Sequence, residues 1–541
     1  MNKLYKIVFP AGIDYIHTPS LSRKTSGASG NSKSSAASAP VIPTPVKTAK
    51  PSGFFGRWGS TLTVSQPVSG ASSPIPADDG PIEELIVSGT AFGHGLFQLV
   101  LSLLPAKVKS VVGFFGLQHD RKLALRALTI SADKNDVHSV FAGLALMSYH
   151  GVVLLMSGYQ ADEQHIFKQY RAIVDKLEKR YPTGTLWILN RAKILRMAGD
   201  ADGAIAVLRD GLKPGRPSVF IQADALLIFE LAWLLLANRE YKAAAETFIR
   251  MTEINSWSHA TYFFLAAGCY WRIGNYEEAD RLLGAIPAAI DKRKIGGKDL
   301  PTEVFIKKRL AFYQAKAGGT KKADATGSEI DTARGITINP AEEMGIFWNN
   351  HARIQKSIAE DHIRDWLALR PPVDVETPYA ADVHASPPSY PTPPPALSTP
   401  DELALRALLL GINHRTAGHF APARAFLLDA HATQPRLATS TWIGGVALFE
   451  LAVLALKEAA RWEDEAAERT SERGSSAEGA GARAASEKAR EVWRGAIKEA
   501  GERLEAAGAL AGSEIDLSSR LESRMAMLRD EIGLKKEILG I

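Results

Sequence analysis

One pattern of small and apolar residues occurs four times in this chain and limits its fold more than any other feature. In each copy a small residue is followed by a turn residue, a second small residue and, four positions later, an apolar residue. The four sets are Ala192, Gly199, Ala204 and Leu208; Ala232, Arg239, Ala244 and Phe248; Ala267, Gly274, Ala279 and Leu283; and Gly411, Gly418, Ala423 and Leu427. Small side chains let two antiparallel helices approach closely, so each copy predicts a helix-turn-helix unit.

The spacing of the copies identifies the kind of repeat. Ala204 and Ala244 are 40 residues apart and Ala244 and Ala279 are 35 apart, close to the ~34-residue period of tetratricopeptide repeats. A degenerate unit is predicted at 137–180, and Phe449-Glu450-Leu451-Ala452 begins a further one, because it matches Phe229-Glu230-Leu231-Ala232. Since such units bury their apolar faces only by stacking, the predicted fold is an all-α tetratricopeptide-repeat solenoid.

Composition divides the chain into four parts. Residues 1–80 are rich in Ser and Pro and are predicted to be a disordered, basic tail. Residues 81–370 form a helical region whose clear repeats lie at about 183–290. Ten prolines mark 371–400 as a Pro-rich linker or exposed insertion, because proline blocks helix interiors. Residues 401–541 carry C-terminal repeats and a helix, and a low-complexity insertion at 463–489 predicts a solvated helix extension or a loop.

Charge and leader patterns exclude several classes of protein. Eight basic residues and three acidic ones lie in 1–80, and the remaining 56 basic and 56 acidic residues balance. The folded part therefore has no net charge that favours nucleic acid as a partner. The N-terminus lacks the continuous apolar run of a secretory signal. It resembles a mitochondrial presequence in composition, but the Ser, Pro and Gly content of 20–77 favours a disordered tail.

Two uncharged stretches reach the length needed to span a membrane. They lie between Glu84 and Lys107 and between Asp136 and Asp162, and they contain His94 and His150. Polar groups cost more in lipid than inside a protein, so both stretches are predicted to be buried helices. His94 and Gln98 should then find partners within the protein. The alternative is a membrane span at 85–104.

Sequence motifs of common enzymes are absent. No HExxH, GxSxG, GxxxxGK[ST] or paired CxxC motif occurs, so we expect no enzyme, no cofactor and no metal. Cys269 is predicted to be a buried thiol rather than a nucleophile. The cluster of Lys292, Arg293, Lys294 and Lys298 could bind an anion or a membrane surface, or it is a plain basic loop.

Carboxylate clamps of tetratricopeptide grooves use Lys and Asn at positions four apart on a first helix. The equivalent pairs in this chain are Leu189/Lys193, Phe229/Trp233, Phe264/Gly268 and Leu408/Ile412. No chaperone carboxylate clamp is therefore predicted. An apolar helix or a lipid-associated segment would fit such a groove better than an acidic tail.

Several long motifs carry a family resemblance over about residues 81–541. EELIVSGTAFGHGLFQLVLSLLPAKVKSVVGFFGLQHDRKLALRAL, GTLWILNRAKILR, KIGGKDLPTEVFIKKRL, PAEEMGIFWN and DLSSRLESRMAMLRDEI resemble the fungal inclusion body clearance proteins. That family is also labelled a mitochondrial outer membrane family and is grouped with tetratricopeptide repeat protein 39. Its members usually carry a longer helical region before the GxGLFxLxLSLLP block. The helix at 85–104 should then lack one covering layer.

The resemblance implies a function without known catalysis. It implies a tetratricopeptide-repeat adaptor that binds lipid-droplet or inclusion-body proteins and acts in lipid-droplet-linked clearance of misfolded-protein inclusion bodies. Its expected locations are the cytoplasm and nucleus, with the mitochondrial outer membrane surface as a further one, and peripheral membrane contact is expected. The alternative is an integral or anchored mitochondrial outer membrane protein.

Overall fold

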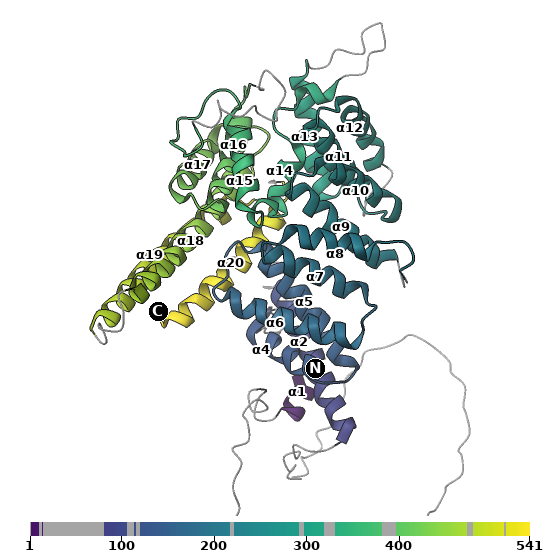
Figure 1. Ribbon diagram of the computed structural model, residues 1–541, viewed down its shortest axis with the longest axis vertical. Coiled ribbons are helices and arrows are strands. Elements are labelled where there is room, and N and C mark those ends of the chain that lie inside the picture. The colour runs from purple at the N-terminus through teal and green to yellow at the C-terminus, as the bar shows by residue number, and fades with distance from the viewer. Residues whose placement is uncertain are drawn as a thin grey trace, which may run out of the picture.

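The structure is a computed structural model of the whole chain. It describes residues 2–9, 13, 80–104, 113–114, 120–216, 221–291, 297–318, 331–380, 396–472, 480–512 and 516–541. The regular secondary structure of these residues is helical, with one isolated bridge between Arg370 and Ala396. Stacked helix pairs form most of the molecule (Figure 1), which confirms the predicted all-α class and its tetratricopeptide-like repeats.

The four predicted repeat units are four helix pairs. They are α7 (Thr185–Met197) with α8 (Ala201–Gly211), α9 (Ile221–Ala237) with α10 (Tyr241–Ile254), α11 (His259–Arg272) with α12 (Tyr276–Asp291), and α16 (Pro400–Thr416) with α17 (Phe420–Ala432). The seven alanines at the small positions have no exposed surface. The turn residues Gly199, Arg239, Gly274 and Gly418 all have positive φ, between 63° and 86°. The repeat register is therefore the one that the sequence predicts.

Four further helices with described bounds lie between residues 80 and 180. They are α2 (Gly80–Leu103), α4 (Arg121–Ala132), α5 (Val137–Met156) and α6 (Glu163–Arg180). Aspartates set the start of three of them: the side chains of Asp120, Asp136 and Asp162 accept hydrogen bonds from backbone N–H groups in the first turns of α4, α5 and α6. Helices α5 and α6 form the predicted degenerate unit.

The beginning of the chain differs from the predicted tail. Asn2–Val8 form helix α1, and the side chains of Phe9 and Ile13 are buried in a cluster with Ala91 of α2 and Ala127 and Ile130 of α4. Apolar residues spaced three to five apart in the first thirteen positions explain this packing. The prediction of a tail is therefore wrong for residues 2–9 and 13, whereas residues 14–79 lie outside the described part. The N-terminal segment supplies part of the cover that α2 was expected to lack.

A mixed segment follows the third repeat. It contains α13 (Pro301–Lys316), the short 3-10 helices η2 (Thr332–Gly335) and η3 (Asn350–Ala352), α14 (Pro340–Phe347) and α15 (Lys356–Leu367). Nearly every residue from 332 to 351 is buried, including Glu342, Glu343 and His351. This segment packs on α9, α11 and α16 and so lies inside the array.

The Pro-rich stretch does not separate two domains. Tyr379 and Leu397 are buried in the same core cluster as the repeats, and the Arg406 guanidinium donates hydrogen bonds to the backbone carbonyls of Leu369 and Pro371. Residues 371–380 and 396–400 are thus packed against the body between α15 and α16. The linker prediction is corrected for these residues, and 381–395 lie outside the described part.

Three long helices complete the chain after the short 3-10 helix η5 (Gln434–Arg436). Helices α18 (Ile443–Glu472) and α19 (Ala480–Leu510) form an antiparallel hairpin, and α20 (Ser518–Leu539) follows. The low-complexity insertion lengthens both arms of this hairpin, which agrees with a helix extension for 463–472 and 480–489. Helix α20 contacts α18, α19 and α5, so the C-terminal end returns to the N-terminal units (Figure 1).

Candidate functional site on the inner face of the array

The inner face is the side of α9, α11 and α16 that contacts residues 331–355. Its positions match those that hold ligands in carboxylate-clamp repeats, and the chain itself covers them. The indole of Trp233 stacks on that of Trp348, with ring centroids 5.0 Å apart. A Cβ atom at Gly268 would lie 2.6 Å from Asn339 Oδ1 and 2.7 Å from the Ala341 nitrogen. Glycine is therefore required where residues 339–341 cross α11.

A network of charged side chains joins this covering segment and the following helix α15 to the repeats. Asp365 of α15 receives hydrogen bonds from both Arg239 and Arg272, and the distance between Arg239 Nη2 and Asp365 Oδ2 is 2.6 Å. The Tyr241 hydroxyl donates to Glu342 Oε1 over 3.0 Å. Arg239 is the only non-glycine residue among the four repeat turns. Its left-handed backbone, which ordinarily favours glycine, directs a guanidinium into the network.

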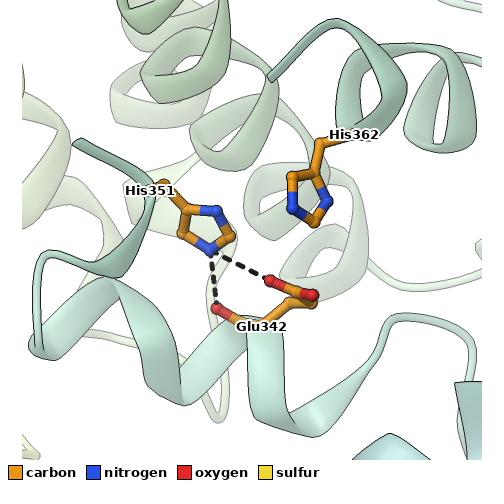
Figure 2. Close-up of side chains that lie close together, drawn as sticks. All are labelled: Glu342, His351 and His362. Atoms are coloured by element: carbon orange, nitrogen blue, oxygen red, sulfur yellow. Dashed lines mark hydrogen bonds and ion pairs between the residues drawn. The ribbon is translucent and has the colours of Figure 1, made fainter. Parts of the chain in front are cut away.

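Glu342, His351 and His362 bring ligand-type atoms together at the centre of this network (Figure 2). Their nearest nitrogen and carboxylate oxygen atoms all lie within 4.8 Å of one another. His351 Nε2 is 3.4 Å from Glu342 Oε2 and 3.1 Å from the backbone oxygen of Glu342. Two histidines and a carboxylate are ligands that zinc and iron use, so the donor set by itself is compatible with a metal site.

The surroundings of His362 argue for a hydrogen-bonded cluster instead. Arg239 Nη1 lies 3.4 Å from His362 Nδ1, and because a guanidinium only donates, Nδ1 must be the acceptor. The proton of the neutral imidazole is then on Nε2, where it prevents that nitrogen from binding a metal. Burial lowers the pKa of His362 well below its ordinary value, and Arg239 lowers it further. The three residues therefore fit a structural role, with Trp366 stacked on the His362 ring.

Helix α20 covers the other end of the inner face. Arg524 of α20 and Arg415 of α16 share one carboxylate, Glu450 of α18, and all three side chains are almost fully buried. Arg524 also donates to Asn349 Oδ1 over 2.9 Å and to the backbone oxygen of Met156 over 3.0 Å. The inner face is thus occupied by this chain's own segments along both halves. The predicted groove for an apolar helix is filled.

The predicted anion or membrane-surface contact falls largely outside the described residues and stays a prediction. Lys298 lies in a short connection before α13, and Lys292, Arg293 and Lys294 lie outside the described residues. Cys269 is fully buried in α11, and burial raises the pKa of its thiol well above the ordinary value, so this thiol is not a nucleophile. No sequence signal indicated the inner-face network, because isolated Glu, His and Asp residues in a helical chain are predicted to be exposed to solvent.

Helix α2 buries several polar residues, and both α2 and α5 expose apolar ones. The buried side of α2 carries Ser88, Thr90, His94, Gln98 and Ser102. The exposed apolar residues of both helices, which we call the outer apolar set, are Ile82, Leu85, Ile86, Val100, Leu103, Val137, Phe141 and Val152.

The two polar residues singled out on α2 differ in their contacts. Gln98 Oε1 accepts a hydrogen bond from the Asp120 nitrogen over 3.2 Å, as expected for a core helix. His94 stacks on Tyr5 of α1 with ring centroids 4.0 Å apart. Neither of its ring nitrogens has a hydrogen-bond partner among the described residues. Burial lowers the pKa of His94, so the ring is neutral near pH 7. The prediction of internal partners is thus met by a hydrogen bond for Gln98 and by a ring contact alone for His94.

Comparison with known proteins settles the family. A family model described as Iml2/Tetratricopeptide repeat protein 39 matches residues 44–416, more than half of the chain. The chain belongs to this family. The predicted family resemblance is therefore confirmed.

Fungal relatives carry names that describe a cellular role. The inclusion body clearance protein IML2 of Schizosaccharomyces pombe is 28% identical over 286 residues, which are 50% of this chain and 48% of the relative. The inclusion body clearance protein of Aspergillus niger is 24% identical over 304 residues, covering 52% of this chain and 42% of the relative. An IML2-like protein of Saccharomyces cerevisiae is 26% identical over 330 residues, covering 54% and 44%. The match thus spans about half the length of these relatives.

Proposed function

We propose that this chain is a non-enzymatic adaptor in the clearance of inclusion bodies, and that its helices α2 and α5 bind the phospholipid surface of a lipid droplet. Membership of a tetratricopeptide-repeat family supports an adaptor that binds proteins, and the names of the relatives support the link to inclusion bodies. We further infer that it works in the cytoplasm and nucleus, with the mitochondrial outer membrane as a second surface.

The outer apolar set is the observation on which the lipid contact rests. A helix on the surface of a soluble domain normally turns its apolar side inward. On α2 five of the eight buried residues are polar, whereas Ile82, Val100 and, on α5, Phe141 are each at least half exposed. An outward apolar side of this kind gains free energy when it enters an apolar environment, at about 25 cal/mol per Å² buried. A lipid monolayer offers that environment without requiring a shaped groove.

A membrane-spanning protein is the second candidate, because α2 and α5 are both long and apolar enough to cross a membrane. Their packing opposes it. Helix α4 lies against α2 and carries Arg121, Lys122 and Arg126, and the strongly charged α6 lies against α5. A span by α2 or α5 would draw these helices into the hydrocarbon layer, where charged groups are costly. Shallow contact through the outer apolar set avoids that cost.

Flotation of the full chain with artificial lipid droplets coated with phosphatidylcholine tests the proposal. The double variant Val100→Ser, Phe141→Ser should float several-fold less than the parent. The matched control is Ile273→Ser, Leu428→Ser, which removes two apolar residues of similar exposure far from α2 and α5. Equal flotation of the parent and the first variant would refute the lipid contact. Alkaline carbonate should release the bound protein, and retention would instead support the spanning alternative.

The clearance role is tested separately in cells. The chain would replace the IML2-like protein of Saccharomyces cerevisiae, and the lifetime of a fluorescent aggregation-prone reporter would be followed. We expect the parent and the control variant to restore clearance and the Val100→Ser, Phe141→Ser variant to fail. If the chain never restores clearance although it floats with droplets, the adaptor role is wrong and the lipid contact still stands.

A further inference from the structure

A small cavity lies at the junction of the repeats with the C-terminal helices. Its volume is about 290 Å³, and it is lined by the C-terminal end of α7, the residues after η3, the last turn of α16 and the middle of α18. These four elements contribute the side chains of Arg196, Arg353, Arg415 and Lys457. We call it the cationic cavity.

The carboxylates around the cationic cavity do not balance its cations. Arg196 pairs with Glu230 over 3.0 Å and Arg353 pairs with Glu163 over 2.7 Å. Arg415 shares Glu450 with Arg524 of α20, so that carboxylate faces two guanidinium groups. Lys457 has no ion-pair or hydrogen-bond partner among the described residues. Five cations (the four lining ones and Arg524) thus meet three carboxylates, which leaves an excess of two positive charges.

Two donors in the cavity wall lack partners. The side chain of Arg196 is only 6% exposed, and its Nε–H has no hydrogen-bond partner among the described residues. Burial, together with the nearby charges of Arg415 and Arg353, lowers the pKa of Lys457 to about 8. An unpaired buried donor such as the Arg196 Nε–H is costly to a protein, and the Lys457 ammonium lies beside it with partial access to solvent. A bound anion would satisfy them.

We propose that the cationic cavity binds a phosphate group, either free or as a monoester. A phosphate dianion carries the two negative charges that the cavity lacks, and its oxygens accept hydrogen bonds from both guanidinium and ammonium groups. The cavity has room for one such group. Because its walls come from α7, α16 and α18, a bound phosphate would also hold the first repeats to the C-terminal helices. The inference does not depend on the proposed lipid contact.

Titration calorimetry of the full chain with inorganic phosphate at pH 7 tests this site. We expect saturable binding of one phosphate per chain, above the effect of sodium chloride at equal ionic strength. Lys457→Met should weaken binding at least tenfold. Lys498→Met, at a side chain 79% exposed, serves as the control and should leave binding unchanged. The site is refuted if phosphate shows no saturable binding or if Lys457→Met binds like the parent.

Binding measurements with two further anions define the ligand. Acetate carries one charge and should bind much more weakly than phosphate; equal affinity would overturn the assignment to phosphate. Glycerol 3-phosphate separates an esterified phosphate from the free ion, since tighter binding of the ester indicates that the natural ligand carries a further group.

The pH dependence provides an independent readout of Lys457. Its ammonium group faces Arg415 of α16, Arg353 after η3, Glu163 of α6 and Glu450 of α18. Lys457 loses its charge as the pH rises past its pKa of about 8, where phosphate is already mostly a dianion, so affinity should fall between pH 8 and 9.5 in the parent. The Lys457→Met variant should show no such fall, and the same fall in that variant would contradict the role of Lys457.

Discussion

Replacing Glu450 by glutamine isolates the charge that holds α20 on the array. The side chain of Glu450 is 1% exposed and pairs with Arg415 and Arg524, which are 2% and 3% exposed. Glutamine keeps the volume but leaves two guanidinium groups facing each other in a buried space. Removing one partner of a buried ion pair costs about 3–5 kcal/mol, so we expect a loss of that size in the free energy of unfolding.

The same substitution at Glu458 is a matched control on the same helix. Glu458 is 32% exposed and pairs with Arg424, which keeps a second partner in Glu499. Exposed pairs contribute about 0.2–1 kcal/mol. Urea unfolding followed by circular dichroism should therefore show a large shift of the midpoint for Glu450→Gln and little for Glu458→Gln. Equal midpoints for the two variants would refute the assignment of α20's anchoring to this buried charge.

The pH dependence of Glu450→Gln follows from the same contacts. Burial alone would raise the pKa of Glu450, but Arg415 and Arg524 outweigh it and hold the pKa below the ordinary value. A carboxylate with a lowered pKa stabilises the folded state above its unfolded pKa and loses that contribution as the pH falls through its folded pKa. The parent and the variant should thus differ fully near pH 7 and converge below about pH 4.

Three other substitutions test separate parts of the structure. Ala279→Arg places a charge at a fully buried helix crossing and should cost at least about 3 kcal/mol; an unchanged melting temperature would show that the repeat register is wrong. Leu99→Lys should abolish the native circular dichroism spectrum because Leu99 is buried, whereas Val100→Lys at the exposed next position should leave it intact. Burial, together with a hydrogen bond to Asp331, raises the pKa of Asp280 to about 7. A raised carboxyl pKa makes the folded state lose stability as the pH rises from about 4 to 7. In Asp280→Asn the urea midpoint should therefore change less with pH between pH 5 and 8 than it does in the parent.

The repeats could be predicted from sequence because their packing depends on local rules. Alanine at Ala204, Ala244 and Ala279 permits close helix approach, and the turn residues fix the angle between paired helices. The position of Arg239 in a turn could also be predicted, because the alignment of the four repeat copies places it there although glycine is the usual residue. Side chains at spacings of three and four carry this information within one unit.

The filling of the inner face could not be predicted, because it depends on partners far apart in the chain. Glu342 and His362 are polar residues that a sequence places in solvent, and they are buried only because Tyr241, Arg239 and Asp365 surround them. The packing of the N-terminal segment on α2 could not be predicted for the same reason. The same holds for the packing of the flanks of the Pro-rich stretch on the core. A high content of Ser or Pro describes a stretch on average and says nothing of the few apolar residues that anchor it.

The return of α20 to α5 sets an order of events during synthesis. A ribosome adds about 5–20 residues per second, and roughly 360 residues separate the end of α6 from the end of α20. For about 20–70 s the first helix pairs therefore exist without the helix that covers Met156 and Ala161. Over that time their apolar surfaces are open to other nascent chains, and we expect general chaperones to bind these helix pairs until α20 leaves the ribosome.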